Sequence, residues 1–506
     1  MARRRFVPAW AAFAAPALMS ALAACTVGPD YVRPAAPAAE TWRTDSYWRL
    51  AAPSHAPLTL DWWRAFGEEE LDALEGQALA QNQTLAAASA HETQARATLA
   101  ATAAQRVPEI DLQGQAERLK ISKNRPLTNY STPSQSTVQN LLTLGPSATY
   151  DVDLFGRIRR EVEGARASAQ QAADDLANAR LIVTADLATD YFALRELDAE
   201  IDVLDRSVRL QEKALEYVKA EHDLGSVSGL DLYQQQAHLD ATRVQATLLV
   251  NQRAQYEHAI AALVGTPAPQ FSIAPSVAQA RVPSIAIGIP SDLLQRRPDI
   301  ASAERAMAAA NAKIGEAKAA FFPSLVLTPG IGWEATAFSS LLTAPSFMWT
   351  LGAQVGQAVF DGGRRQANVN FASAGYAQAE ANYRQTVLDA FQQVQDGVTG
   401  LSVLDAASKQ AHAAVEDAQR LLSLANDRYS GGLVAYLDVI DAQQSLLTSQ
   451  RTEVQIHGQR MALCVALVKA LGGGWEDKTV AGNASKAGQT DPIEADRSNR
   501  TREAND

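Results

Sequence analysis

The chain has 506 residues, a formal net charge of −11, two cysteines and only 7% aromatic residues. Acidic and basic residues are interspersed along it. Because binding to a phosphate backbone requires clustered Lys and Arg that displace counterions, this pattern excludes nucleic acid as an expected partner. Abundant alanine, glutamine and leucine favour long helices over a compact mixed core.

The N-terminal residues have the composition of an export signal, with three arginines, an apolar stretch and then small residues. The stretch "LAAC", which ends at Cys25, is typical of a bacterial lipobox, in which the cysteine is lipidated and becomes the first mature residue. Ordinary cleavage beside an unmodified Cys25 is the alternative. We therefore predict a lipoprotein signal peptide over residues 1–24 and a lipidated, extended segment over residues 25–62.

After the signal, no stretch reaches the roughly 18 uninterrupted apolar residues that a membrane helix requires. Entry of the mature chain into a membrane is therefore expected to use strands. The second cysteine, Cys464, lies in the apolar helical stretch "MALCVALVKAL", where we expect a buried, unreactive thiol.

The sequence contains an internal repeat, in which one structural unit occurs twice. The stretch "LGSVSGLDLYQQQ" aligns without gaps with "GGLVAYLDVIDAQ", so that Gly225 corresponds to Gly432 and Asp231 to Asp438. The two halves should therefore share one architecture. The predicted organisation is a first repeat over residues 63–264, a Pro-rich connector over 265–290, a second repeat over 291–471 and a polar, disordered tail over 472–506.

Each repeat begins with an Ala-rich helix that ends at Pro108 or Pro323, after which apolar and polar residues alternate with the period of a strand. We predict β-hairpins over residues 108–155 and 323–360. Four strands are too few to close a barrel, which needs about eight. The residues expected to face lipid are Leu112, Val152, Leu327 and Leu351, and those expected to face water are Asp111, Gln113, Asp151 and Asp153.

The hairpins are followed by helical patterns that continue for nearly the whole of each repeat. Apolar residues at alternating spacings of four and three form coiled-coil seams. The first seam is Leu197, Ile201, Leu204, Val208, Gln211, Leu215 and Val218, and the second is Ala411, Val415, Ala418, Leu422 and Ala425. The predicted long helices are 156–223 and 229–264 in the first repeat and 363–430 and 435–471 in the second.

The stretch "GIPSDLLQRRPDIASAE" opens the second repeat. Its serine can cap a short helix, an Asp and an Arg four residues apart can pair, and Pro followed by acids suits the next helix start. We expect a structural hinge made of Ser291, Asp292, Arg296, Arg297, Pro298 and Asp299. The sequence contains no nucleophile, phosphate-loop or metal-ligand motif, so no enzyme, no metal and no cofactor other than a covalent lipid on Cys25 is expected.

These motifs, together with "CTVGPDYVRP", "YDVDLFGRIRR", "AKAAFFPSLVLTPGIG", "QAVFDGGRR" and "RYSGGLVAYLDVIDAQQSLL", closely resemble the TolC-like outer-membrane factors. The resemblance covers about residues 25 to 475 and is to the OprM- and NodT-type efflux lipoproteins. It implies a mainly helical TolC-like fold with a membrane β-barrel. Three chains would form a homotrimer whose twelve strands close the barrel and whose helices continue it as an α-barrel.

The resemblance also implies a function and sites. The protein would be a passive conduit in the outer membrane, working with a periplasmic adaptor protein and an inner-membrane RND-type pump. Adaptor docking is expected at the turns of the long helices, namely Gly225, Val227, Ser228, Gly432, Leu433 and Val434. A periplasmic gate is expected at Leu437 and Asp441, which lie one helical turn apart, with Tyr429 nearby.

Other interpretations remain open from the sequence. Within the family, the chain could serve type I protein secretion or metal export. Outside it, a coiled-coil envelope lipoprotein without a pore would explain the long helices but not the amphipathic strands. The exported substrate is not encoded here, because the pump selects it.

Overall fold

The computed structural model describes residues 26–35, 60–120, 122, 138–278, 280–283 and 293–475. The predicted signal peptide, Cys25, Ser291, Asp292 and the tail beyond residue 475 lie outside this part of the chain. Contacts divide the chain into two compact units. The sheet unit comprises 1–34, 93–171 and 303–382, and the hairpin unit comprises 35–92, 172–302 and 383–506. Each unit therefore combines segments of both sequence repeats.

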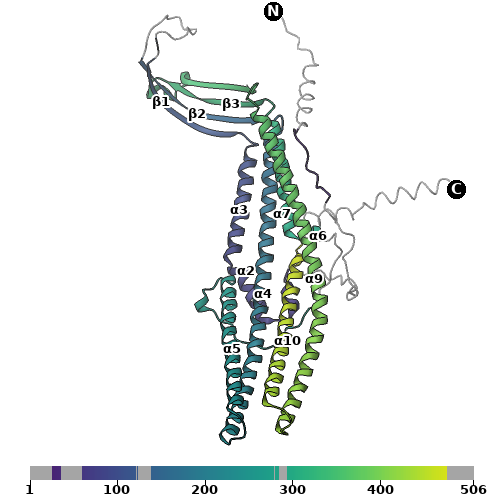
Figure 1. Cartoon of the computed structure of the whole chain (residues 1–506). Helices are drawn as coiled ribbons and strands as arrows, with labels where there is room; N and C mark the ends of the chain where they lie inside the picture. The colour runs from purple at the N-terminus through teal and green to yellow at the C-terminus, as the bar shows by residue number, and fades with distance from the viewer. Residues whose placement is uncertain are drawn as a thin grey trace, which may run out of the picture. The chain divides into compact units, whose positions relative to one another are not determined.

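The sheet unit contains four antiparallel strands in the order β1-β2-β3-β4 (Figure 1). Both hairpins begin just after the prolines that end the preceding helices. The loop between β3 and β4 carries the short helix α8 (Phe338–Leu341). The strands are β1 (Glu109–Lys120), β2 (Val138–Val152), β3 (Ser324–Ala335) and β4 (Phe347–Gly356).

The strand register places apolar side chains on one face of this sheet. Leu112 pairs with Pro146, Tyr150 with Leu327, and Pro329 with Leu351, and residues directly opposite each other share a face. Leu112, Val152, Leu327 and Leu351 therefore lie on the same face, as their alternation predicted. The other face carries Asp111, Gln113, Gln115, Thr149, Asp151, Thr328, Thr350 and Gln354.

The expectation that Asp153 belongs to the polar face of the sheet was wrong. It lies beyond the end of β2, and its carboxylate accepts hydrogen bonds from the backbone N–H of Arg159 (2.9 Å) and from the Arg159 Nε (3.3 Å). A carboxylate beside the first turn of a helix is stabilised by the unpaired N–H groups there. Asp153 therefore belongs to the junction between strand and helix.

Glycines on the polar face let neighbouring strands approach closely. A Cβ on Gly145 would lie 2.2 Å from the Ile331 carbonyl oxygen, and one on Gly332 would lie 2.6 Å from that of Leu144. Small residues on one face allow a sheet to curve toward that face. The polar face is therefore suited to be the inner, concave one.

The segment after the predicted lipid site docks on the sheet unit. The Val27 N–H donates to the Phe155 carbonyl (3.1 Å) at the end of the first hairpin. The buried Arg160 guanidinium donates to the carboxylate of Asp30 (2.7 Å) and to backbone carbonyls, and the Tyr31 hydroxyl donates to Glu304 (2.5 Å). Residues 26–35 thus form a fixed extended strap.

Long helices make up most of the rest of the chain. Two of them, α4 and α9, have 67 residues each, or about 100 Å at 1.5 Å per residue. No helix within the described residues has the length and apolar composition needed to cross a membrane. The helices of eight or more residues are α2 (Glu69–Gln81), α3 (Gln83–Ala104), α4 (Arg157–Asp223), α5 (Gly229–Leu263), α7 (Pro298–Ala319), α9 (Arg364–Ser430) and α10 (Tyr436–Ala470).

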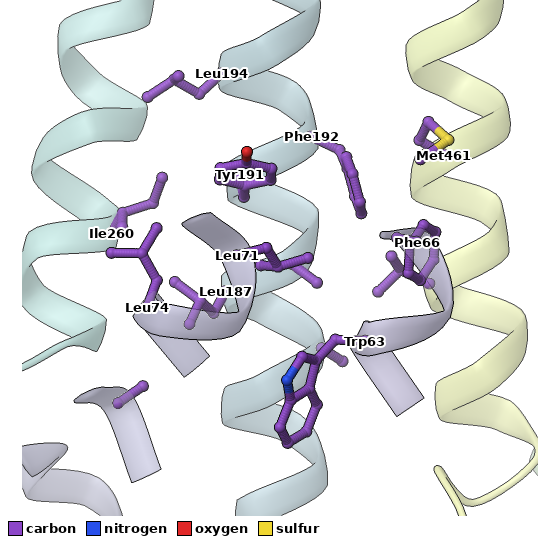
Figure 2. Close-up of a cluster of buried hydrophobic side chains, with 14 of the residues drawn as sticks. Trp63, Phe66, Leu71, Leu74, Leu187, Tyr191, Phe192, Leu194, Ile260 and Met461 are labelled. Atoms are coloured by element: carbon purple, nitrogen blue, oxygen red, sulfur yellow. The ribbon is translucent and has the colours of Figure 1, made fainter. Parts of the chain in front are cut away.

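The main core of the hairpin unit forms where a short 3-10 helix, η1 (Trp62–Phe66), and α2 pack among the long helices. Figure 2 shows Phe66 beside Phe192 of α4, with ring centroids 4.8 Å apart, and Met461 of α10 belongs to the same cluster. The thiol of Cys464 is buried within this core, as the sequence predicted, and burial raises its pKa to about 11.

Alternate residues of the first coiled-coil seam are buried within the hairpin unit. Leu197, Leu204, Gln211 and Val218, each seven residues from the next, are at most 7% exposed. The predicted start of the disordered tail at residue 472 was too early. Gly472 and Gly473 are buried, because their positive φ angles fold the chain back against η1 and the carbonyl of Arg296.

Candidate functional site at the helix turns

The candidate site consists of the two turns that join α4 to α5 and α9 to α10. Gly225 and Gly432 have φ angles of 77° and 69°, a left-handed conformation that glycine adopts without strain. The Ser226 N–H bonds back to the Glu221 carbonyl (2.8 Å), and the Leu433 N–H to the Arg428 carbonyl (2.9 Å). Both helices thus end in the same type of C-terminal cap.

The helices that leave the two turns are capped differently. At the first turn, Ser228 and Asp231 bond reciprocally, with the Ser228 N–H donating to the Asp231 carboxylate at 3.2 Å and the Ser228 hydroxyl accepting from the Asp231 N–H at 3.4 Å. At the second turn, the Ala435 N–H donates to the Asp438 carboxylate at 3.1 Å. Alanine has no hydroxyl, so only half of the capping box exists there.

Two tyrosines connect the second helical hairpin to the first. The Tyr429 hydroxyl donates to the Glu221 carboxylate (2.9 Å), and the Tyr436 hydroxyl donates to the Gln235 side-chain oxygen (3.1 Å). The two tyrosine rings pack edge to face with centroids 5.1 Å apart. Burial and the nearby carboxylate of Glu221 raise the pKa of Tyr429 to about 12, so its hydroxyl remains a donor.

Of these four residues, the sequence analysis singled out only Tyr429. Glu221 and Gln235 resemble many other polar residues on the long helices, and only the fold brings them to the tyrosines. A weak signal existed at Tyr436, because a tyrosine on the buried face of a helix normally needs a partner for its hydroxyl.

The predicted gate residues divide into two groups. Leu437 and Asp441 lie one turn apart on the exposed side of α10, away from the buried Val439. Leu437 is 48% exposed. Tyr429 instead turns toward Glu221 and the first hairpin. The structure therefore brings Leu437 and Asp441 together on one surface, and it gives Tyr429 a different contact.

The predicted docking residues also differ in exposure. Leu433 is 72% exposed, whereas Val227 and Val434 are half-buried, and Val227 packs against the apolar cluster between the hairpins. Two residues that the sequence analysis did not select, Leu224 and Leu230, expose 82% and 66% of their surface. Both leucines lie next to a glycine of the turn, and this was the sequence signal that could have identified them.

The described residues of the predicted hinge lie away from these turns. The Arg297 guanidinium makes hydrogen bonds to both carboxylate oxygens of Asp299 (3.0 and 2.6 Å), to the Gln393 side chain (2.9 Å) and to the Ala470 carbonyl (3.0 Å). Helix α7 begins at Pro298, beside this cluster. Arg297 thus joins the start of α7 to α9 and α10. Across the described segments, no group of three His, Cys, Asp or Glu residues is placed to hold a metal ion.

Comparisons with known proteins agree with this fold. The family described as "Outer membrane efflux protein" matches residues 74–266 and 289–473. The cation efflux system protein CusC of Escherichia coli is 30% identical over 460 residues, which cover 90% of this chain and 97% of that protein. The pyoverdine export outer membrane protein OpmQ of Pseudomonas aeruginosa is 31% identical over 434 residues, covering 85% and 91%.

Solved structures give the same result. The outer-membrane channel OprN matches with a TM-score of 0.82 and 27% identity, covering 90% of this chain and 100% of that one. The open state of the Neisseria gonorrhoeae MtrE outer membrane channel matches with a TM-score of 0.76 and 25% identity, covering 89% and 99%. The fold is that of the TolC-like outer-membrane channels, and the chain belongs to the outer membrane efflux protein family.

Proposed function

We propose that this protein is the outer-membrane channel subunit of a tripartite efflux system and forms a passive trimeric conduit. The observation that carries the proposal is the sheet with one continuous apolar face. Ile110, Leu112, Trp349 and Leu351 on that face are each between 68% and 76% exposed. A soluble protein rarely leaves such a surface uncovered, whereas lipid covers it in a membrane barrel.

Closure of the barrel follows from the two edge strands, β1 and β4. Strands β1 and β4 run in opposite directions because the sheet is antiparallel throughout. The β4 edge of one copy can therefore pair with the β1 edge of the next in the same antiparallel manner. Repetition through three copies gives twelve strands and leaves no free edge.

The proposed system includes a periplasmic adaptor and an inner-membrane RND-type pump, which supplies the energy and selects the substrate. The named relatives support assignment to efflux, since they include the toluene efflux pump outer membrane protein TtgF of Pseudomonas putida. Metal-ion export is the second candidate, because CusC is a cation efflux protein by name. The exposed Leu224, Leu230 and Leu433 at the turns supply the apolar surface for an adaptor.

Lipidation of Cys25 would give the protein a second membrane attachment besides the barrel. The strap supports this proposal, because Val27 is bonded to Phe155 at the end of the first hairpin. A lipid on Cys25 would thus be attached two residues before Val27, which is fixed at the base of the barrel. One acyl chain alone binds membranes weakly, so Cys25→Ser with a replacement signal peptide should still yield membrane trimers.

The gate is proposed at Leu437 and Asp441. Threefold symmetry would convert each into a ring, with leucines that exclude water and carboxylates that favour cations. Three like charges repel one another, so the leucines and pairing with basic groups such as Arg428 would have to hold the aperture shut.

The decisive experiment compares two neighbouring positions on β1. Arginine on the lipid face of a membrane barrel costs about 2–4 kcal/mol at the midplane and far less in the lumen. Leu112→Arg should therefore prevent assembly of membrane trimers, and Gln113→Arg should leave trimers that conduct in planar bilayers. Equal damage from the two substitutions, or wild-type trimers that never conduct, would favour a structural lipoprotein without a pore.

A further inference from the structure

A small cavity lies inside the hairpin unit, away from the turns. It is enclosed by α4, by α10 and by the connector near Ala280, and its volume is about 20 Å³, which is room for one water molecule. Three ionisable side chains line it, namely Arg195 and Glu196 from α4 and His457 from α10. The sequence analysis assigned no role to any of them.

The Glu196 carboxyl lies directly on the backbone of α10. A Cβ added to Gly458 would lie only 1.9 Å from the Glu196 Oε2, so no larger residue fits there while the carboxyl keeps its place. One turn along α4, Glu200 is paired with Arg451 at 2.6 Å. Within the described residues, Glu196 has no such partner.

The charged groups around the cavity are already engaged elsewhere. The Arg195 guanidinium binds Glu70 and Asp198. On α10, Arg460 pairs with Asp405 (3.0 Å), and Glu453 contacts His412 (2.7 Å). None of these groups compensates a negative charge on Glu196.

Burial and the nearby Arg460 lower the pKa of His457, which favours the neutral ring, and the Ala280 backbone opposes this shift. A neutral imidazole has one ring nitrogen that donates and one that accepts. His457 can therefore accept a hydrogen bond from a water molecule in the cavity.

We propose that this cavity is a proton-binding site, in which the Glu196 carboxyl carries the proton and one water molecule links it to His457. The proton comes from bulk water and returns to it. Burial and the negative charge of Glu200 raise the pKa of Glu196 to about 7. The site therefore exchanges its proton close to neutral pH.

The proton affects how tightly α4 and α10 are held together. Loss of the proton leaves a carboxylate in a poorly solvated position without a partner, which is unfavourable. Because the pKa in the folded protein is above the ordinary value of 4.5, the protonated group contributes stability that is complete below pH 4.5 and is lost as the pH rises to about 7. Helix α10, which carries Leu437 and Asp441, is thus held less firmly at neutral pH than in acid.

Infrared difference spectroscopy on the purified full-length protein tests the site directly. The spectrum of the wild type minus that of Glu196→Gln should contain a protonated-carboxyl band that disappears with a midpoint near pH 7. In the wild-type spectrum before subtraction, Glu75 is a useful internal reference, because burial raises its pKa to about 9 and its band should persist through this range. A difference spectrum without a protonated-carboxyl band at pH 5 would overturn the proposal.

Three variants sharpen the test. Glu200→Gln should lower the midpoint, because it removes the negative charge that raises the pKa of Glu196. Gly458→Ala should also lower it, because the added methyl group displaces the carboxyl toward solvent. His457→Phe should shift the position of the band, because the water molecule loses its partner. An unchanged midpoint in both Glu200→Gln and Gly458→Ala would contradict the assignment.

A second measurement does not depend on channel function. The ratio of the unfolding equilibrium constants of the wild type and Glu196→Gln should change by at most about tenfold per pH unit between pH 5 and pH 7, and then remain constant. Titrating groups that do not interact with Glu196 cancel in this ratio. A ratio independent of pH would show that Glu196 contributes packing alone.

Discussion

The two helix turns occupy equivalent positions in the sequence repeat, yet their contacts run in different directions. In the first turn, His222 bonds to the Val227 carbonyl within the same turn (3.1 Å), beside Gly229. In the second, the equivalent residues are Tyr429 and Tyr436, and both reach across to the first hairpin. The hydrogen bond of His222 thus stays within the first turn, whereas the tyrosine hydroxyls of the second turn bind the neighbouring hairpin.

We expect this difference to decide which turn moves more readily. The hydrogen bond of the first turn does not depend on the second hairpin, although Val227 packs against the apolar cluster between them. A turn held by two hydrogen bonds and an apolar cluster shared with the neighbouring hairpin can be released when those contacts break. The proposed gate residues lie on this second hairpin.

The largest expected effect distinguishes the two hairpins by function. Leu437→Ala should raise the basal conductance of trimers in planar bilayers severalfold and should sensitise cells to large antibiotics such as vancomycin. Leu230 is the equivalent leucine of the first repeat and is also exposed, so Leu230→Ala is the matched control and should leave the conductance unchanged. Asp441→Asn should mainly weaken cation selectivity. Equal conductance of the two leucine variants would place the gate elsewhere.

The contacts between the hairpins should be unequal in strength. Tyr436→Phe leaves the side-chain oxygen of the fully buried Gln235 without its donor, although the Gln235 amide still donates to the Gln211 carbonyl. The unsatisfied oxygen should cost about 1–3 kcal/mol. Tyr429→Phe removes a bond closer to solvent and should cost about 0.5–1.5 kcal/mol. Chemical denaturation followed by circular dichroism measures both. If Tyr429→Phe proved the more destabilising variant, the cluster between the hairpins would not be organised around Tyr436.

Features that the two turns share should respond equally. Gly225→Ala and Gly432→Ala each place a side chain at a positive φ in open space. Each should therefore cost about 1–2 kcal/mol through the backbone alone. The same denaturation measurement applies, and a difference greater than about 1 kcal/mol between the two variants would mean that one glycine has a further role.

The repeat explains why so much of the fold could be predicted from the sequence. Alternation with a period of two predicted the strands and their faces, heptad spacing predicted the coiled-coil seams, and glycines predicted the turns. Each of these patterns depends only on residues that are close together in the sequence. The prediction for Asp153 was wrong because the alternation of apolar and polar residues continues beyond the end of β2. There the carboxylate accepts a hydrogen bond from the N-terminal turn of α4. Contacts such as Tyr429 with Glu221 were not predicted, because they join residues that only the packing of two hairpins brings together.

The smallest expected effect concerns the helix caps, where the repeats differ by one hydroxyl group. Ser228→Ala should cost about 1 kcal/mol, the usual contribution of an N-cap side chain. Ala435 has the extended conformation of an N-cap (φ −76°, ψ 156°), and Asp438 already accepts its N–H. Ala435→Ser should therefore complete the capping box and stabilise α10 by up to about 1 kcal/mol. The conductance of Ala435→Ser should stay at the wild-type level, because a cap holds the start of α10 without adding a contact to the first hairpin. If this variant instead lowered the conductance, the start of α10 would have to unwind when the channel opens, and the second hairpin would not move as a rigid body.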